Sequence, residues 1–546
     1  MSLHPKGGEF SRFYSDIHLL IDWQDNGNFI RTFGNLRNLN FFFRPGLTWS
    51  RRTTSRLSMR VLPRNCIFAD KGPAIFICDD DYQSLLALLA VVNSAVFQLF
   101  VEIQLAAADA AARSYEVGII QRTPVPDLTS EYITTLATLA RRAWSLKRNL
   151  DTVTQTSHAF NLPGLLQVGG ISIAERSQSW ANHVAEIEAE LTQSQAKIDA
   201  LAFDLYGIGG RDCATLEHTE INPEATAADD DEDNDAIADP LSHTQEMIAY
   251  ALGVAIGRFD VRLATGARSA PPEPEPFDPL PVCSHGMLVG IDDLPPVSPA
   301  ELPANYPIPV SFNSSILDDD GHPNDLITHL RQALEIIWGD RASEIEQEAC
   351  QILGVRTLLD YFRNYTPTKT KASFFAEHLS RYSKSRRQAP IYLPLSTRSG
   401  SYTLCLYYHR LTDQTLYTAI NDYIEPKLLR TRDRATQLRN KTDRTTRESK
   451  QLETLQDLES ELTDLCDELL RIAKLPYQPN LNDGVQITVA PSGHSSACPN
   501  GKKTQRNLGN PRKRRLRLVT SRPQHLARSC PPEMPNRQIP RDRPQP

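Results

Sequence analysis

The sequence predicts an α+β protein: a mixed α/β domain at the N-terminus, long helices, a mostly helical C-terminal region and a disordered tail. Three observations predict this class. In residues 9–80, apolar and aromatic runs alternate with Asn-Gly and Pro-Gly turn signals, which is typical of strands and hairpins. Leu-rich stretches with helical periodicity follow. The 546 residues are 40% hydrophobic and 23% charged, which suits several cores and excludes a disordered chain, a collagen-like repeat and a small disulfide scaffold.

The first predicted domain, residues 1–128, combines these strands with a helical stretch at 82–113. Within it, Leu85–Val101 is seventeen residues long and uncharged. Asn93, Ser94 and Gln98 interrupt it, and a bilayer span needs about 20 mostly apolar residues, so we expect a buried helix and no membrane contact.

A helical spacer is expected over 129–220. Its clearest part is 181–206, where apolar residues recur every seven positions, which fits either a coiled-coil seam or an ordinary amphipathic core helix. That repeat consists of Val184, Leu191, Ile198 and Leu205, with Ile187 and Leu201 between them.

The remaining segments follow from composition. Residues 221–245 are acidic and predict a solvated linker rather than a metal site, because a mobile carboxylate run lacks a rigid cage. An α+β region is expected over 246–426, with Pro-rich zones at 271–282 and 295–308, helices over 323–354 and strands over 383–425. One long helix is expected over 427–475, and a disordered tail over 491–546.

Cysteine usage and the N-terminus point to the cytoplasm. The nine cysteines are odd in number and scattered without a CxxC pair, so neither a zinc site nor a disulfide framework is predicted. The first residues are polar and lack the apolar core of a secretory signal.

Charge is distributed unevenly along the chain. Residues 501–546 hold thirteen Lys and Arg against two acids, a net charge of +11, so residues 1–500 carry −18 of the total of −7. Within that acidic body, residues 31–71 hold nine basic residues and a single acid, Asp70. This local surplus is the most informative signal in the sequence.

The basic residues of 41–71 alternate with aromatic and hydroxyl side chains, a pattern that suits nucleic-acid binding. The alternative is that these charges form an ordinary solvent-exposed face. A second basic stretch at 381–390 supports nucleic-acid binding only slightly. Arginine can hold a phosphate or read guanine, and hydroxyl groups can contact the DNA backbone. Trp49 suits either a contact with DNA or a place in the protein core. The candidate DNA contacts are Arg44, Thr48, Trp49, Arg51, Arg52, Arg56 and Lys71.

Several long strings resemble one protein family. PKGGEFSRFYSDIHLLIDW, FFFRPGLTWSRRTTSRLSMRVLP, CIFADKGPAIF and YEVGIIQRTPVPDL resemble the target-recognition region of the adenine-specific DNA methyltransferases of BREX phage-defence systems (the PglX family) and of fused type IIG restriction–modification enzymes. Further similar strings, such as IDALAFDLYGI and LPYQPNLNDGVQIT, extend the resemblance over roughly residues 5–490. The resemblance implies double-stranded DNA and other defence-system subunits as partners.

The family's catalytic motif is missing. The resemblance implies S-adenosyl-L-methionine as the family's cofactor and an (N/D/S)-P-P-(Y/F) loop that holds the flipped adenine. The three Pro-Pro pairs stand in APPE, LPPV and CPPE, and none fits. YGIGG at 206–210 follows a predicted helix, not a strand, so it does not predict a cofactor loop, and no endonuclease core is evident. We therefore expect no catalytic, cofactor-binding or metal-ligating residue in this chain, and a separate or missing methyltransferase domain.

Two alternatives to this interpretation stay open at this point: a non-enzymatic protein that binds other subunits of the same system, and an intact enzyme with unrecognised motifs. The tail raises a separate question. Codons can be chosen for Gln505–Pro531 so that reading one nucleotide downstream gives a Trp-rich ending similar to the family's. We expect a frameshift between about Ala490 and Thr504; a genuine basic arm that binds nucleic acid is the alternative.

Overall fold

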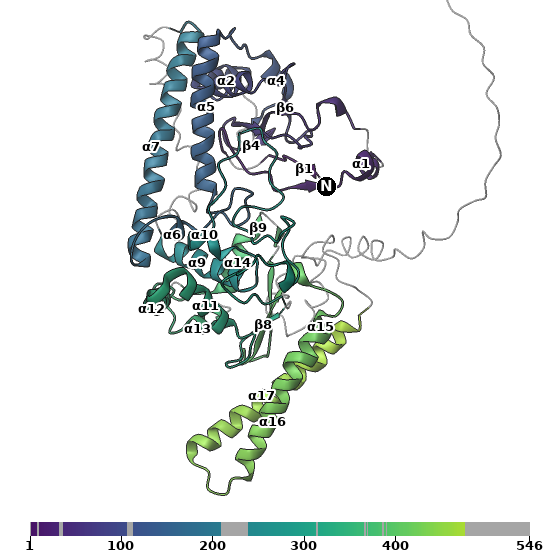
Figure 1. The fold of residues 1–546 in the computed structure, drawn as a ribbon. Coiled ribbons are helices and arrows are strands. Elements are labelled where there is room, and N and C mark those ends of the chain that lie inside the picture. Colours follow the sequence, from purple (N-terminus) through teal and green to yellow (C-terminus); the bar gives the residue numbers. More distant parts are fainter. Residues whose placement is uncertain are drawn as a thin grey trace, which may run out of the picture. The chain divides into compact units, whose positions relative to one another are not determined.

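The computed structural model describes residues 2–7, 10–31, 36–105, 113–208, 239–312, 315–364, 367–368, 370–384, 387–388 and 390–475. The chain divides into two compact units, Met1–His378 and Leu379–Pro546 (Figure 1). Helices make up 52% and strands 9%, which confirms the predicted α+β class. Most of the predicted acidic linker 221–245 and all of the predicted tail 491–546 lie outside the described residues.

Short antiparallel strands form the N-terminal part of the first unit. The main sheet has the order β5-β3-β6, and Leu47 of β3 stands opposite Val61 of β5 and Ile75 of β6. All residues of β3 and β5 are buried, because neighbouring elements cover both faces. The strands are β1 (Ser2–Leu3), β2 (Leu20–Ile21), β3 (Gly46–Trp49), β4 (Arg52–Thr53), β5 (Met59–Leu62), β6 (Ala74–Ile75) and β7 (Arg113–Ser114).

Short helical turns connect these strands. α1 (Gln24–Arg31) contains the predicted Asn26–Gly27 turn, and both residues have left-handed backbone angles, with φ of 57° and 74°. The 3₁₀ helix η1 (Leu39–Phe41) follows.

The helix predicted over 82–113 is two helices, α2 (Tyr82–Val92) and α3 (Ala95–Gln104), bent by 64° at their junction. The Asn93 amide causes the break: its Oδ1 accepts from Met59 N and its Nδ2 donates to Met59 O, both at 3.0 Å. Ser94 then caps α3 by accepting from Phe97 N. Among the described residues, no one helix has the length and apolar character of a bilayer span, although α2 and α3 reach those limits when taken together.

Two long helices of the predicted spacer 129–220 lie side by side in Figure 1: α5 (Ser130–Asp151) and α7 (Ile173–Leu205). The apolar stripe of α7 packs within the chain, where Val184, Ile187 and Ile198 are buried. This resolves the alternatives in favour of an amphipathic core helix. The short helices α4 (Val117–Arg122) and α6 (Gly164–Gln167) flank α5.

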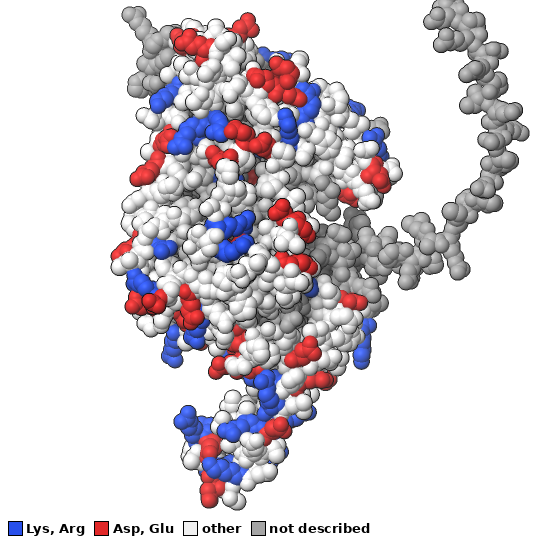
Figure 2. Space-filling view, viewed as in Figure 1, with Lys and Arg blue, Asp and Glu red and all other residues white. Residues whose placement is uncertain are grey.

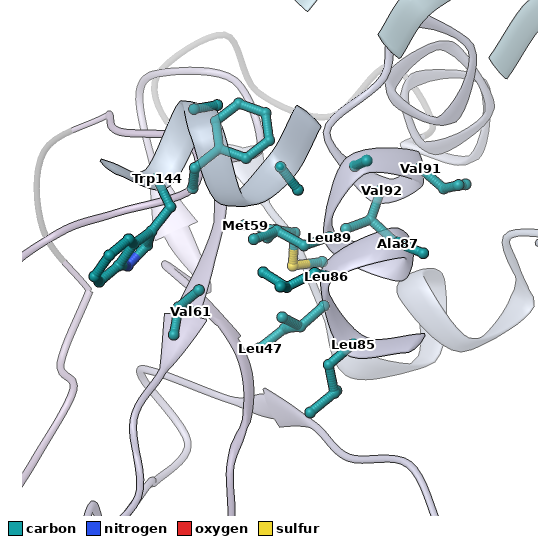
Figure 3. Close-up of a cluster of buried hydrophobic side chains, with 14 of the residues drawn as sticks. Leu47, Met59, Val61, Leu85, Leu86, Ala87, Leu89, Val91, Val92 and Trp144 are labelled. Atoms are coloured by element: carbon teal, nitrogen blue, oxygen red, sulfur yellow. The ribbon is translucent and has the colours of Figure 1, made fainter. Parts of the chain in front are cut away.

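One hydrophobic core joins the sheet to these helices. Leu47 and Met59 of the sheet meet Leu86 and Leu89 of α2 (Figure 3). Trp144 of α5 and Ile198 of α7 belong to the same cluster. The helices of the predicted spacer thus share their core with the predicted N-terminal domain. Each fully buried leucine contributes about 1.5–3 kcal/mol.

The rest of the first unit is mainly helical, with irregular chain across the predicted Pro-rich zones. α11 (Leu326–Trp338) and α12 (Ala342–Ile352) fill most of the predicted helical stretch 323–354, and Gly339, with φ of 57°, separates them. The other elements are α9 (Pro240–Ala255), α10 (Val261–Ala264), η4 (Pro299–Glu301), β8 (Ser315–Leu317), η5 (Gly339–Arg341), α13 (Leu358–Arg363) and α14 (Phe374–Arg381), the last of which runs across the unit boundary.

The second unit contains a β-hairpin and a helical hairpin. β11 (Tyr392–Ser396) pairs with β12 (Thr403–Tyr407) within the predicted strand region 383–425, and Gly400, with φ of 78°, lies in the turn between them. The smaller elements are β9 (Ser383–Lys384), β10 (Arg387–Gln388), η6 (Tyr408–Arg410), α15 (Thr415–Thr418) and the π-helix η7 (Ala419–Ile424).

The prediction of a single helix over 427–475 is wrong. The structure has two packed helices, α16 (Glu425–Asn440) and α17 (Thr446–Ala473) (Figure 1). Thr445 and Glu448 form a capping box that starts a new helix at this point. The T-x-x-E pattern that marks this start is visible in the sequence.

Candidate nucleic-acid interface

Two of the predicted DNA contacts lie in the core of the sheet. Thr48 is 5% exposed and its hydroxyl donates to Pro73 O at 2.9 Å. Trp49 is 1% exposed and its indole N–H donates to Tyr115 O at 2.9 Å. Because both polar atoms already have protein partners and neither side chain reaches solvent, these residues position the sheet and cannot touch a duplex directly.

Arg44 is engaged inside the protein. Its guanidinium donates to both carboxylate oxygens of Asp80 and to Ile77 O, at 2.6–3.1 Å. It also lies over the rings of Phe41 and Phe76, at 5.3 and 5.8 Å. The hydrogen bond to Asp80 raises the pKa of Arg44 further. Arg44 therefore clamps the chain before β3 to the turn before α2.

Arg51 is half-exposed and paired with two acids. It contacts Asp70, and its second terminal nitrogen lies 2.8 Å from a Glu116 oxygen. The hydrogen bond from Arg51 is the main reason why the pKa of Glu116 is lowered. The two carboxylates hold the guanidinium at the surface in one orientation.

Arg52 and Lys71 are exposed, and Arg56 is half-buried. None of these three side chains forms an ion pair or hydrogen bond with the described residues. β4 carries Arg52 and pairs with β7, where Arg113 stands opposite Thr53. The backbone of Lys71 meets Arg51, because Arg51 N donates to Lys71 O at 3.4 Å. We call the resulting group the basic strip: Arg51, Arg52, Arg56, Lys71 and Arg113.

The strip is only partly neutralised. Three carboxylates accompany its five cations: Asp70 and Glu116 on Arg51, and Glu102 at 3.1 Å from Arg113. Arg113 was missed in the sequence because β-pairing, not sequence proximity, brings it there. Figure 2 shows basic and acidic side chains interspersed over the visible face rather than one broad positive surface.

Other arginines of the predicted basic segment serve the scaffold. Arg60 is 4% exposed and donates to the Ser50 hydroxyl at 2.6 Å, and burial lowers its pKa to about 10. Arg64 is exposed and lies over the Tyr82 ring at 5.2 Å. The second basic stretch, 381–390, is described only in part.

The described residues contain no group of three His, Cys, Asp or Glu side chains that could hold a metal ion. YGIGG begins where α7 ends, so the part of it that is described does follow a helix. It therefore lacks the strand-to-helix context of a dinucleotide-type loop.

No family model matches this chain. It is 23% identical over 513 residues to the adenine-specific methyltransferase BrxX of Escherichia coli O9:H4 (strain HS), which covers 89% of this chain and 39% of that protein. It is 24% identical over 524 residues to the adenine-specific methyltransferase PglX of Lacticaseibacillus casei (strain Zhang), covering 89% of this chain and 38% of the relative. The chain thus spans about two fifths of the length of these relatives. The adenine-specific methyltransferases BrxX and PglX are homologues of this chain, in line with the resemblance seen in its sequence.

Proposed function

We propose that this chain is the DNA-recognition part of a site-specific adenine N6 DNA methyltransferase of a phage-defence or restriction–modification system, and that it acts in the cytoplasm. The basic strip carries this proposal, because it places exposed cations, unpaired among the described residues, beside an oriented arginine at the edge of the β4–β7 pair. The relatives' names supply the reaction: methyl transfer to adenine.

Three of the five strip residues have distinct parts in this proposal. Arg52 and Lys71 contact phosphates of double-stranded DNA, since both are exposed and without a protein partner among the described residues. Arg51 is held by Asp70 and Glu116 at a fixed angle, which suits a forked contact to a phosphate or to guanine. The acids beside the cations weaken non-specific attraction and so favour a correctly fitted duplex.

Methyl transfer requires a domain that these 546 residues do not supply. The three Pro-Pro pairs lack the flanking residues that an adenine-methylating loop needs. S-adenosyl-L-methionine is therefore bound by that other domain, and the partners of this chain are duplex DNA, the methyltransferase domain and further subunits of the defence system.

Binding to a labelled duplex, measured by fluorescence anisotropy over a range of salt concentrations, tests the DNA-recognition role. Each lost phosphate contact lowers the slope of log K against log salt by about 0.9, so Arg52→Ala and Lys71→Ala should each flatten it by up to that amount. Arg447→Ala is the matched control: Arg447 is exposed on α17 and has no ion pair among the described residues. All variants keep the basic tail. If the strip variants bind like Arg447→Ala, the assignment of DNA binding to the strip is wrong.

A methyl-transfer assay with S-adenosyl-L-methionine and adenine-containing duplex tests the second part of the proposal. This chain alone should give no turnover. Turnover above that of a heat-inactivated sample would mean that the chain holds an unrecognised catalytic centre.

A non-enzymatic protein that binds other subunits is the second candidate function, and one observation favours it. Val282 and Val297, in the two Pro-rich zones, and Ile291, between these zones, are 87%, 74% and 89% exposed. Exposed apolar residues of this kind suit a protein contact. This candidate predicts no salt-sensitive duplex binding, so the anisotropy experiment separates the two.

A further inference from the structure

Two arginines without hydrogen-bond partners lie near the start of β5. Arg12 and Arg56 are both half-buried, and neither forms a hydrogen bond or an ion pair with the residues that the structure describes. Burial lowers the pKa of Arg12, the charge of Asp199 raises it, and the like charge of Arg56 lowers it again. The two guanidinium groups are therefore close enough to repel each other, so an anion held by both would relieve this repulsion.

The backbone holds Arg12 in one place beside β5, an outer strand of the main sheet. The next residue, Phe13, is 4% exposed, donates from its N to Met59 O at 2.9 Å and accepts from Val61 N at 3.0 Å. Its φ of 70° is left-handed, which is costly for a residue with a bulky side chain. Such a conformation persists only where the surroundings enforce it, and here it fixes how the chain presents Arg12.

The turn that carries Arg56 is anchored on both sides. The Tyr115 hydroxyl donates to Ser55 O at 3.3 Å, and Gln98 Nε2 donates to Leu57 O at 3.0 Å. Leu57 is also 1% exposed, so its side chain fixes this end of the turn in the core. Because both neighbours of Arg56 are held, its backbone needs little further ordering when the side chain binds a ligand.

Both guanidinium groups have nitrogens that reach solvent. Arg12 Nε is buried without a partner. The two terminal nitrogens of Arg12 and all nitrogens of Arg56 also have no partner among the described residues, but they are not fully buried. The ring of Phe10, which is 45% exposed, lies 5.6 Å from the Arg12 guanidinium. Arg12 therefore keeps its stem in the protein and presents its terminal nitrogens at the surface.

One carboxylate acts on this pair. Asp199 of α7 influences Arg12 by its charge but forms no ion pair with it. Its Oδ1 accepts from Ala95 N at 2.7 Å and from Gln195 Nε2 at 3.0 Å, which holds the carboxylate at the start of α3. One carboxylate against two guanidinium groups leaves this cluster with a net positive charge.

We propose that Arg12 and Arg56 together bind one backbone phosphate of double-stranded DNA, which extends the basic strip onto the N-terminal segment. This inference rests on the proposed DNA-recognition role, because Arg56 belongs to the basic strip. Guanidinium groups donate strong, forked hydrogen bonds to phosphate oxygens, and a shared phosphate removes the repulsion between the two arginines. Phosphate contacts carry no sequence information, so this pair sets the position of the duplex and does not select its bases.

Fluorescence anisotropy of the full chain with a labelled duplex, over a range of salt concentrations, tests the shared phosphate. One phosphate contact contributes about 0.9 to the slope of log K against log salt, which is about 8-fold in affinity per ten-fold change in salt. Arg12→Gln and Arg56→Gln should each flatten the slope by up to about 0.9. The double variant should flatten it by no more than about 0.9 in total, because both residues hold one phosphate. A loss of about 1.8 in the double variant would mean two separate phosphates and would overturn the shared site.

Arg447→Gln is the matched control, since Arg447 is exposed on α17 and has no ion pair among the described residues. Arg52→Ala separates this inference from the proposed function. If Arg52→Ala flattens the slope while Arg12→Gln and Arg56→Gln bind like the control, the inference is wrong and the DNA-recognition role stands. If all of these variants bind like the control, the DNA-recognition role of the basic strip fails, and the inference fails with it.

Circular dichroism checks that each variant folds. Should Arg12→Gln not fold, Arg12→Met takes its place, because an apolar chain suits the buried stem. Should neither Arg12 variant fold, Arg56→Gln decides alone, and a slope equal to that of the control refutes the site.

Discussion

Glu116 offers the sharpest test of the proposed role of the basic strip, because under that proposal its carboxylate would compete with DNA for Arg51. It lies 2.8 Å from the Arg51 guanidinium, and its side chain is 43% exposed. Glu116→Gln removes the charge and keeps the shape. For a bound phosphate about 6 Å from this carboxylate, Coulomb's law gives a repulsion of about 0.7 kcal/mol at a dielectric constant of ~80 and about 1.4 kcal/mol at ~40.

Glu116→Gln should therefore tighten duplex binding by about 3- to 10-fold at low salt, and less at high salt because ions screen the repulsion. Stability should change little, since exposed ion pairs contribute little to stability and Arg51 keeps Asp70. Fluorescence anisotropy at several salt concentrations measures the effect. Glu190→Gln is the control, because Glu190 is 40% exposed and pairs with Arg142 away from the strip. Weaker binding by Glu116→Gln, or binding equal to that of Glu190→Gln, would refute the competition.

Two further predictions concern stability, both measured by urea unfolding. A Cβ on Gly253 would lie 2.2 Å from the buried Phe259 ring, so Gly253→Ala should destabilise by about 1–3 kcal/mol, whereas Gly118→Ala, which meets nothing within 4 Å, should not destabilise. Burial opposes protonation of His158, but its hydrogen bond to Asp16 and that residue's charge outweigh burial and raise the pKa of His158. The pair therefore stabilises the folded state below about pH 6.5, and this stabilisation is lost as the pH rises through the raised pKa of His158. Asp16→Asn should therefore cost more stability at about pH 5.5 than at about pH 8.5. An equal cost at both pH values would contradict this assignment.

Helices were the part of the fold that the sequence predicted best. The spacing of apolar residues defined α5 and most of α7, because the period of 3.6 residues is a local property. Breaks in helices were harder to predict. The junction at Asn93 depends on its hydrogen bonds to Met59, which lies on a distant strand. The break before α17 had a local capping signal, the T-x-x-E pattern of Thr445 and Glu448.

By itself, the sequence determined the α+β class, the positions of the main helices, the concentration of basic residues at 31–71 and the resemblance to adenine-specific methyltransferases. Only the tertiary structure decided what each basic residue does. Arg44 is held by Asp80, Arg51 by Glu116, and Arg148 by no described residue. The reason is physical: residue type and local spacing set helix propensity and charge, whereas burial and ion pairing depend on groups far apart in the chain that only the fold brings together.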